Sequence, residues 1–208
     1  MDASLLFLFI PTFFLVSISP GMCMTLALTL GMSVGVRRTM YMMVGELLGV
    51  AAVAIAAVLG VAAIMLKFPE LFVALKLVGG VYLIYIATQM WRSKGSMSVS
   101  SELSKKVDTS RFTLFSQGLI TAIANPKGWA FMISLLPPFI SPEKPFWMQL
   151  TILVAIILCS EFICMMIYAT GGKTLGLLLS NGRNVVLVNR ISASLMFAVA
   201  IWLVSDLL

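Results

Sequence analysis

The chain has 208 residues, of which 61% are hydrophobic and only 11% are charged, and its mean hydropathy is +1.07. Soluble domains have about 45–50% apolar and about 25% charged residues, so this composition excludes an ordinary soluble domain and indicates a multi-pass membrane protein. The absence of histidine excludes histidine metal ligands, histidine general bases and a Ser-His-Asp triad. The net charge of +6 does not indicate a nucleic-acid partner, because the basic residues cluster in short loops between apolar runs.

Six apolar runs are long enough for a helix to cross a bilayer, which takes about 20 residues. In chain order they cover residues 4–32, 40–66, 71–91, 112–140, 146–170 and 189–207. Tight turns are expected at residues 67–70 and 141–145, a polar linker at 92–110, and a glycine-containing, partly amphipathic connection at 171–188. We therefore predict one all-α transmembrane domain over residues 1–208, with three spans on either side of the linker.

The distribution of basic residues over the loops predicts the orientation in the membrane. Loops 1–2, 3–4 and 5–6 and their flanks hold ten of them: Arg37, Arg38, Arg92, Lys94, Lys105, Lys106, Arg111, Lys173, Arg183 and Arg190. The other two loops hold only Lys67 and Lys144. Loops rich in lysine and arginine stay in the cytoplasm, so we expect those three loops inside and both termini outside.

Two of the apolar runs contain a helix breaker beside polar groups: Ser19-Pro20-Gly21 in the first and Asn125-Pro126-Lys127 in the fourth. Proline removes a backbone donor and clashes with the preceding turn, so each helix should unwind there. Freed backbone groups are tolerated at membrane depth only where protein buries them or where they line a watery cavity. Two such breaks, one in each half, point to a transporter binding site, whereas the alternative is a pair of simple proline kinks.

The second span of each half contains the intramembrane acids, Glu46 and Glu161. An odd number of spans per half gives the two halves opposite orientations in the membrane. We therefore predict an inverted repeat, about residues 1–91 and about residues 111–208, with its site at the interface near the bilayer midplane.

Lys127 and Gly21 are the candidates for binding an anionic group. A lysine near the centre of a span costs about 2.5 kcal/mol or more and by default indicates function, here neutralising a substrate carboxylate or pairing with an acid. The alternative is a lysine that reaches the cytoplasmic surface. Gly21 would let a ligand approach the backbone, and the free amides of the half-helix from Met22 could receive a carboxylate.

Glu46 is the candidate for the opposite charge. Gly45 and Gly49 flank it and form a small-residue face that would bring another helix close and bury the acid near the first break. There it could take up and release a proton or hold a substrate ammonium; the alternative is a structural acid paired with Lys127 or Arg37. Glu161 and Gln117 are supporting candidates with weaker arguments, the latter as a polar wall.

Two other classes of transporter remain alternatives. Cys23 follows the first break, but a disulfide carrier needs two thiols that can reach each other, and the fourth span has no cysteine beside its break. A metal-ion transporter would prefer a midplane rich in carboxylates or histidines, and a central lysine repels cations. A purely structural membrane subunit is a third reading, against which the cost of burying Lys127 is the main argument.

Several motifs follow one another over residues 15–140: Pro20-Gly21, Gly31-x-x-x-Gly35-x-Arg37, Gly45-Glu46-x-x-Gly49, Lys76-x-x-Gly79-Gly80-x-Tyr82-Leu83-x-Tyr85, Gln117-Gly118, Asn125-Pro126-Lys127 and Leu136-Pro137-Pro138-Phe139. In this order they resemble the lysine exporter (LysE/RhtB) family of amino-acid exporters. The resemblance implies a six-span protein of the bacterial inner membrane that exports amino acids or similar small zwitterions, driven by the proton gradient. It also implies the transport residues, which are Pro20, Gly21, Glu46, Asn125, Pro126 and Lys127.

The chain departs from the family's pattern at two places. The family usually has Gly-Pro at the first break, followed by another proline or a similar residue, where this chain has Ser-Pro-Gly-Met. It commonly has aspartate where Glu46 stands, and the longer acid changes its reach by one methylene, which bears on substrate size. We expect a secondary active exporter working by proton antiport with alternating access. Its expected partners are the amino-acid substrate, protons and the lipid bilayer; we expect no enzymatic activity, cofactor or bound metal, and a homodimer is left open.

Overall fold

The computed structural model of this chain describes residues 3–67, 69–92, 110–136, 139–140 and 144–205. The regular elements of this part are eight α-helices: α1 (Ala3–Ile18), α2 (Met22–Ser33), α3 (Val36–Lys67), α4 (Pro69–Arg92), α5 (Arg111–Ile123), α6 (Pro126–Leu135), α7 (Phe146–Ser180) and α8 (Gly182–Ser205). The predicted all-α class is therefore confirmed. Most of the predicted linker at residues 92–110, and parts of the predicted turns at 67–70 and 141–145, lie outside the described residues.

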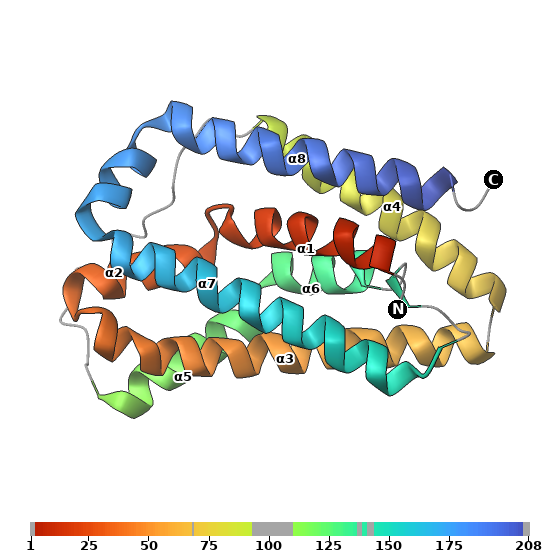
Figure 1. Ribbon diagram of the computed structural model, residues 1–208, viewed down its shortest axis with the longest axis horizontal. Coiled ribbons are helices and arrows are strands. Elements are labelled where there is room, and N and C mark those ends of the chain that lie inside the picture. Colours follow the sequence, from red (N-terminus) through yellow and green to blue (C-terminus); the bar gives the residue numbers. More distant parts are fainter. Residues whose placement is uncertain (1–2, 68, 93–109, 137–138, 141–143, 206–208) are drawn as a thin grey trace.

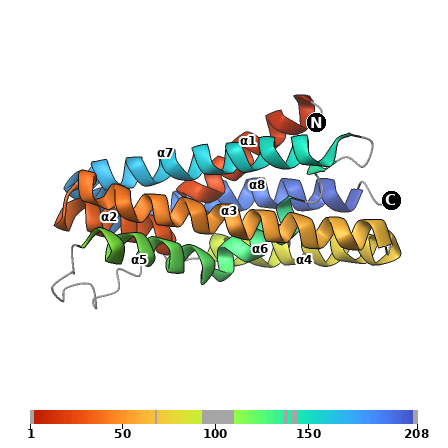
Figure 2. The same cartoon turned by 90° about the horizontal axis from the view of Figure 1, so that it is seen from below.

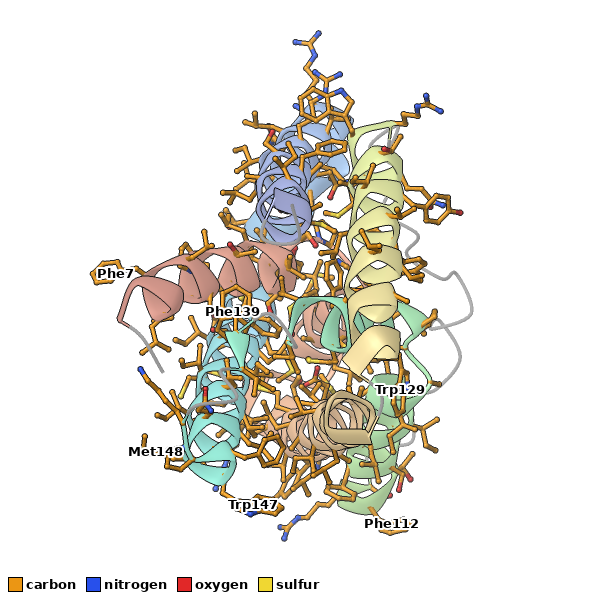
Figure 3. All side chains as sticks on the ribbon, turned by 90° about the vertical axis from the view of Figure 1, so that its right-hand side faces the viewer. Phe7, Phe112, Trp129, Phe139, Trp147 and Met148 are labelled. Carbon is orange, nitrogen blue, oxygen red and sulfur yellow. The ribbon has the colours of Figure 1, made fainter. Side chains whose placement is uncertain are left out.

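The helices run along the long axis of the molecule in three tiers (Figures 1 and 3). Helix α8 forms one outer tier and α3, α5 and α7 form the other, while α4 runs obliquely from the end of α3 to α8. The shorter helices α1 and α6 lie between them. Each long helix packs against both parts of a broken helix from the other half of the chain: α3 contacts α5 and α6, and α7 contacts α1 and α2. The inverted repeat itself stays a prediction.

Two stretches of the described chain, Val36–Gly60 in α3 and Phe146–Gly172 in α7, are long and apolar enough to cross a membrane. The pair Leu6–Ile18 and Met22–Ser33 passes the same criterion together, with a bend of 57° between its two parts. This gives two spans, or three if the bent pair counts as one, and the count of six remains a prediction.

Large apolar side chains cover the outside of the bundle. Phe7, Phe112 and Trp147 are 83%, 79% and 68% exposed and point outward in the end view, whereas Phe139 points inward and is fully buried (Figure 3). Soluble monomers rarely expose large contiguous apolar patches. The outer surface therefore suits a protein whose surroundings are lipid.

The chain leaves helical geometry at two short segments. Residues 19–21 separate α1 from α2, and residues 124–125 separate α5 from α6. Pro20 lies within the first segment, whereas Pro126 is the first residue of α6. A proline at that position is favourable, because its missing N–H would have no intrahelical partner anyway. The second proline therefore marks the start of a new helix.

The structure differs from the expected connection at residues 171–188, which is helical over almost its whole length. Helix α7 continues to Ser180 and α8 begins at Gly182. The direction changes inside α7 at Gly172, whose φ of 46° and ψ of −132° are not helical. This left-handed φ is easily accessible to glycine. The glycine that predicted a connection therefore forms a kink between two helical pieces.

Small residues allow α3 and α5 to pack closely together. A Cβ added at Gly45 would collide with the carbonyl oxygen of Phe115, and one added at Gly118 would collide with that of Met42. A Cβ at Gly49 would lie 2.7 Å from the Cβ of Ala122. The predicted small-residue face is therefore used, and its partner is α5. This packing fixes the position of Glu46, which lies between the two glycines of α3.

Candidate functional site

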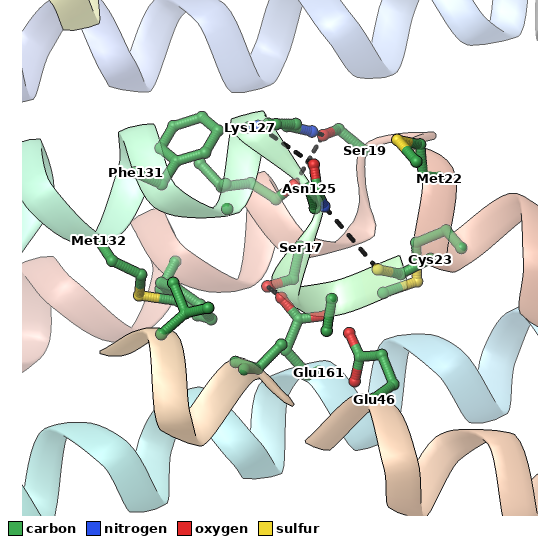
Figure 4. Close-up of a pocket in the computed structure, with 18 residues that line it drawn as sticks. Ser17, Ser19, Met22, Cys23, Glu46, Asn125, Lys127, Phe131, Met132 and Glu161 are labelled. Atoms are coloured by element: carbon green, nitrogen blue, oxygen red, sulfur yellow. Dashed lines mark hydrogen bonds between the residues drawn. The ribbon is translucent and has the colours of Figure 1, made fainter. Parts of the chain in front are cut away.

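A cavity of about 60 Å³ lies where the two interruptions meet (Figure 4). Its walls come from α1, α2, α3, α5, α6 and α7 and from the non-helical segments. They include the polar or charged residues Ser17, Ser19, Cys23, Glu46, Asn125, Lys127 and Glu161, and the apolar residues Phe13, Val16, Met22, Met24, Val50, Val53, Ala122, Phe131 and Met132, together with Gly21 and Gly128. The volume has room for only a few water molecules, since each needs about 10–15 Å³.

Hydroxyl groups donate hydrogen bonds to the carbonyl groups at the end of α1. Val16 lies four residues before Pro20, whose nitrogen has no hydrogen to donate. Three hydroxyls donate to carbonyl oxygens in the last turn of α1: Ser19 Oγ to Val16 O at 2.6 Å, Tyr168 OH to Ile18 O at 2.8 Å, and Ser192 Oγ to Leu15 O at 2.8 Å. Backbone acceptors that the interruption would leave unpaired thus have partners from α7, α8 and the break itself.

The start of α2 presents backbone amides to the cavity. Its N-cap is Gly21, in an extended conformation, and no side chain caps the helix. The first intrahelical bond of this turn runs from Thr25 N to Gly21 O at 2.9 Å. Among the described residues no side chain accepts a hydrogen bond from the first-turn N–H groups, and Met22 and Cys23 of this turn line the cavity. Such a helix start has a partial positive charge and favours anions.

The start of α6 is capped and carries the lysine. Asn125 is the N-cap, and its Oδ1 accepts a hydrogen bond from the backbone N–H of Lys127 at 3.1 Å. Its Nδ2 is 3.8 Å from Cys23 Sγ in the first turn of α2. The ammonium of Lys127 donates to Ser19 Oγ at 2.6 Å and lies 5.7 Å from the centre of the Phe131 ring. Asn125 and Lys127 thus join the two interruptions directly.

Lys127 also stands beside the open start of α2. A Cβ built on Gly21 would lie 3.9 Å from Lys127 Nζ and 3.8 Å from Ser19 O. The absence of a side chain at position 21 therefore leaves the space next to the ammonium open. A full positive charge and the partial charge of a helix start occupy the same part of the cavity, an arrangement that suits a carboxylate.

The two acids lie on the other side of the cavity (Figure 4). Glu46 is 1% exposed, and neither of its carboxylate oxygens has a hydrogen-bond partner among the described residues. Glu161 accepts a hydrogen bond on Oε1 from Ser17 Oγ at 2.8 Å. The alternative pairing of Glu46 with Lys127 or Arg37 is not found as a hydrogen bond among the described residues. A buried polar atom without a partner is costly and calls for an explanation, such as a ligand or a proton.

The cavity brings together five of the predicted residues: Gly21, Glu46, Asn125, Lys127 and Glu161. Pro20 and Pro126 shape the backbone on either side and do not line it. Gly45 and Gly49 face α5, where their role is close packing. Gln117 lies on α5 outside the lining, so the structure gives no support for it as a polar wall.

Sequence reasoning missed Ser17, Ser19 and Tyr168 as partners of the site. The two serines flank Ile18 in an otherwise apolar run, directly before Pro20, and this polar content beside a break was a usable signal. Tyr168 lies 150 residues from its partner, Ile18, and nothing in the local sequence indicates that pairing.

The fold and the site define a helical membrane protein with a charged cavity between two interrupted helices, an architecture typical of transport proteins. The family model described as "LysE type translocator" matches residues 14–207. The chain therefore belongs to the LysE type translocator family, and the resemblance seen in its motifs is confirmed.

Three curated relatives illustrate the similarity. The "Homoserine/homoserine lactone efflux protein" of Salmonella typhimurium is 26% identical over 199 residues, which cover 96% of this chain and 95% of the relative. An "Uncharacterized membrane protein" of Vibrio cholerae is 23% identical over 195 residues, 94% of each chain. The "Uncharacterized membrane protein YahN" of Escherichia coli is 28% identical over 153 residues, 74% of this chain and 66% of the relative. No solved structure matches this chain significantly.

Proposed function

We propose that this protein is a secondary active exporter of amino acids or related small zwitterions, working from the cytoplasm by proton antiport with alternating access. The observation that carries the proposal is the division of charge in the cavity between the interruptions: Lys127 and the uncapped start of α2 on one side, Glu46 and Glu161 on the other. The name of the Salmonella typhimurium relative, an efflux protein for homoserine and its lactone, supports the class of substrate and the direction.

In this proposal the substrate carboxylate binds at the positive side. It would accept hydrogen bonds from Lys127 Nζ and from the free amides at the start of α2. Lys127 Nζ at present donates to Ser19 Oγ, which is an uncharged acceptor. A carboxylate would replace it, because hydrogen bonds to a charged acceptor are stronger. Asn125 already caps the start of α6, whereas the N-cap of α2 is a glycine. The start of α2 is therefore the one whose backbone amides can donate to the substrate.

The substrate ammonium binds at Glu46, whose two oxygens have no other partner among the described residues. The cavity holds two carboxyl groups against one lysine, and an uncompensated charge at this depth is costly. Either an ammonium or a proton on one acid balances the excess. Exchange between these two would couple proton entry from outside to release of the amino acid.

We infer alternating access from the position of the cavity between the two interrupted helices. The cavity of about 60 Å³ holds a few water molecules. In the proposed cycle the cavity widens and opens toward each side of the membrane in turn. The interruptions at residues 19–21 and 124–125 provide hinge positions, since residues at helix ends absorb changes in backbone angle.

The test is export from cells preloaded with a panel of dipeptides, with the protein and its variants present at equal amounts in the membrane. Lys127→Ala removes a charged hydrogen-bond donor, which contributes about 1.5–3 kcal/mol or roughly a tenfold to hundredfold change in affinity. We expect a loss of export of that order. Arg183→Gln, which also removes one positive charge but at an exposed site, should export as wild type. Wild-type export by Lys127→Ala would contradict the proposal, as would accumulation of the amino acid inside energised cells.

Two further variants separate the coupling mechanism from the alternatives. Glu46→Gln keeps the shape of the side chain but cannot exchange a proton, so we expect its residual export to be insensitive to collapse of the proton gradient. Full, gradient-dependent export by this variant would remove Glu46 from the coupling step. Cys23→Ser should export normally, because thiol chemistry has no part in the proposed cycle.

A further inference from the structure

Three arginines surround a groove at the end of the bundle where α3 and α5 begin. Arg37 and Arg38 lie in the first turn of α3, and Arg111 is the first residue of α5. Together with Tyr41 they line a hollow of about 340 Å³, larger than the buried cavity. The two helices lie side by side and start at the same end in both side views (Figures 1 and 2). The guanidinium of Arg111 lies over the Tyr41 ring, 5.3 Å from its centre.

The positive charge of this groove has no counter-charge among the described residues that line it. None of the four is acidic, and neither α3 nor α5 has an acidic residue in its first turn. Both helix starts add partial positive charge, which makes arginine an unfavourable residue there. Three guanidinium groups nevertheless surround one concave space at these helix starts, where positive charge is unfavourable. This arrangement indicates a site for a bound anion. Guanidinium groups recognise phosphate particularly well, because their donors match its oxygens in pairs.

The surface next to the groove distinguishes a lipid from a free phosphate. Residues 41, 44 and 48 follow each other at helical spacing, so they lie on one face of α3. On that face Tyr41, Val44 and Leu48 are 37%, 51% and 54% exposed. An apolar strip therefore leads from the arginines along the membrane-spanning part of α3. A tyrosine between charge and apolar strip is typical of the bilayer interface.

We propose that the groove of Arg37, Arg38, Tyr41 and Arg111 binds the phosphate headgroup of an anionic phospholipid, with an acyl chain along Val44 and Leu48. Basic pockets between helices on the cytoplasmic side are suited to such headgroups. The lipid would bridge α3 and α5, the pair whose close packing positions Glu46. The proposal does not depend on the transported substrate.

The test is thermal unfolding of the detergent-solubilised full-length protein during titration with short-chain phosphatidylglycerol. Phosphatidylcholine of the same chain length and inorganic phosphate serve as separate arms. Arg38→Gln/Arg111→Gln removes two charges from the groove, including the arginine that stacks on Tyr41. The matched control is Arg183→Gln/Arg190→Gln, which also removes two charges and one stacked arginine, since Arg190 lies 5.6 Å from the centre of the Trp91 ring.

We expect phosphatidylglycerol to raise the Tm of wild type and of the control, and phosphatidylcholine and inorganic phosphate to have much weaker effects. The groove variant should bind phosphatidylglycerol roughly tenfold to thirtyfold more weakly, at about 1 kcal/mol for each arginine. The same weakening in the control variant would overturn the proposal, because it would mean diffuse attraction to a basic surface. If inorganic phosphate raises the Tm as much as phosphatidylglycerol does, the ligand of the groove is a free anion and the lipid proposal is wrong. If phosphatidylglycerol does not raise the Tm of the wild-type protein, that result alone overturns the proposal.

Discussion

Replacing Gly49 with alanine tests whether the contact between α3 and α5 is as close as the structure has it. The added Cβ would lie 2.7 Å from Ala122 Cβ and 3.0 Å from Leu119 O. Carbon atoms prefer separations of about 3.5–4.0 Å, so the two helices would have to move apart by about 1 Å. The atoms in the way are a Cβ and a backbone oxygen, which cannot rotate aside. Overpacking of this kind costs about 1–3 kcal/mol.

A matched control lies further along the same helix. Apart from its chain neighbours and the nearby backbone of its own helix, no heavy atom of the described residues comes within 4 Å of a Cβ added at Gly60. Gly60→Ala should therefore show only the gain from replacing a helical glycine, about 0.5–1 kcal/mol. The assay is thermal unfolding of the purified protein in detergent, with export measured in parallel. We expect a lower Tm for Gly49→Ala than for wild type, and a Tm at or above wild type for Gly60→Ala.

A second change checks that the steric contact is the cause. Ala122→Gly removes the atom that an alanine at position 49 would meet, so it should restore part of the Tm that Gly49→Ala loses. The two substitutions should therefore be non-additive, as expected for residues in contact. If Gly49→Ala is as stable as Gly60→Ala, the close approach of α3 and α5 is refuted, and with it the argument for how Glu46 reaches the cavity.

Two further predictions concern the interruptions. Tyr168→Phe removes the hydroxyl that donates to Ile18 O at 2.8 Å and leaves a partly buried carbonyl without this partner. It should lower the free energy of unfolding by about 1–3 kcal/mol, seen as a lower Tm. Asn125→Ala removes the side-chain cap on the N–H of Lys127 and should cost about 0.5–2 kcal/mol, whereas Asn125→Asp keeps the acceptor and most of the stability.

Both predictions have internal controls. Tyr82 is exposed on α4, so Tyr82→Phe should leave the Tm unchanged. Equal losses at positions 82 and 168 would mean that the hydroxyl of Tyr168 does not hold the end of α1. If Asn125→Asp is as unstable as Asn125→Ala, the capping role is wrong and the amide's contact with Cys23 becomes the better explanation.

The sequence alone determined the features that depend on local chemistry. Apolar runs of sufficient length dictated helices, and the observed ends of α3 and α4 lie within a few residues of those predicted. The proline motifs singled out in the sequence lie at the two non-helical segments, residues 19–21 and 124–125, while proline as the cause of the breaks stays a prediction. The family was recognisable from short motifs, because each of them is a string of neighbouring residues.

The tertiary structure decided which faces of the helices meet. In a membrane span the sides toward lipid and toward protein are both apolar, so the hydrophobic pattern carries little information about rotation around the helix axis. This is why the pairing of Ser17 with Glu161, 144 residues away, was not predictable. For the same reason the sequence predicted that Gly45 and Gly49 face another helix, but only the structure identified that helix as α5. The groove of three arginines has the same origin, because charges read from the sequence as a topology signal converge on one site only when α3 and α5 pack together.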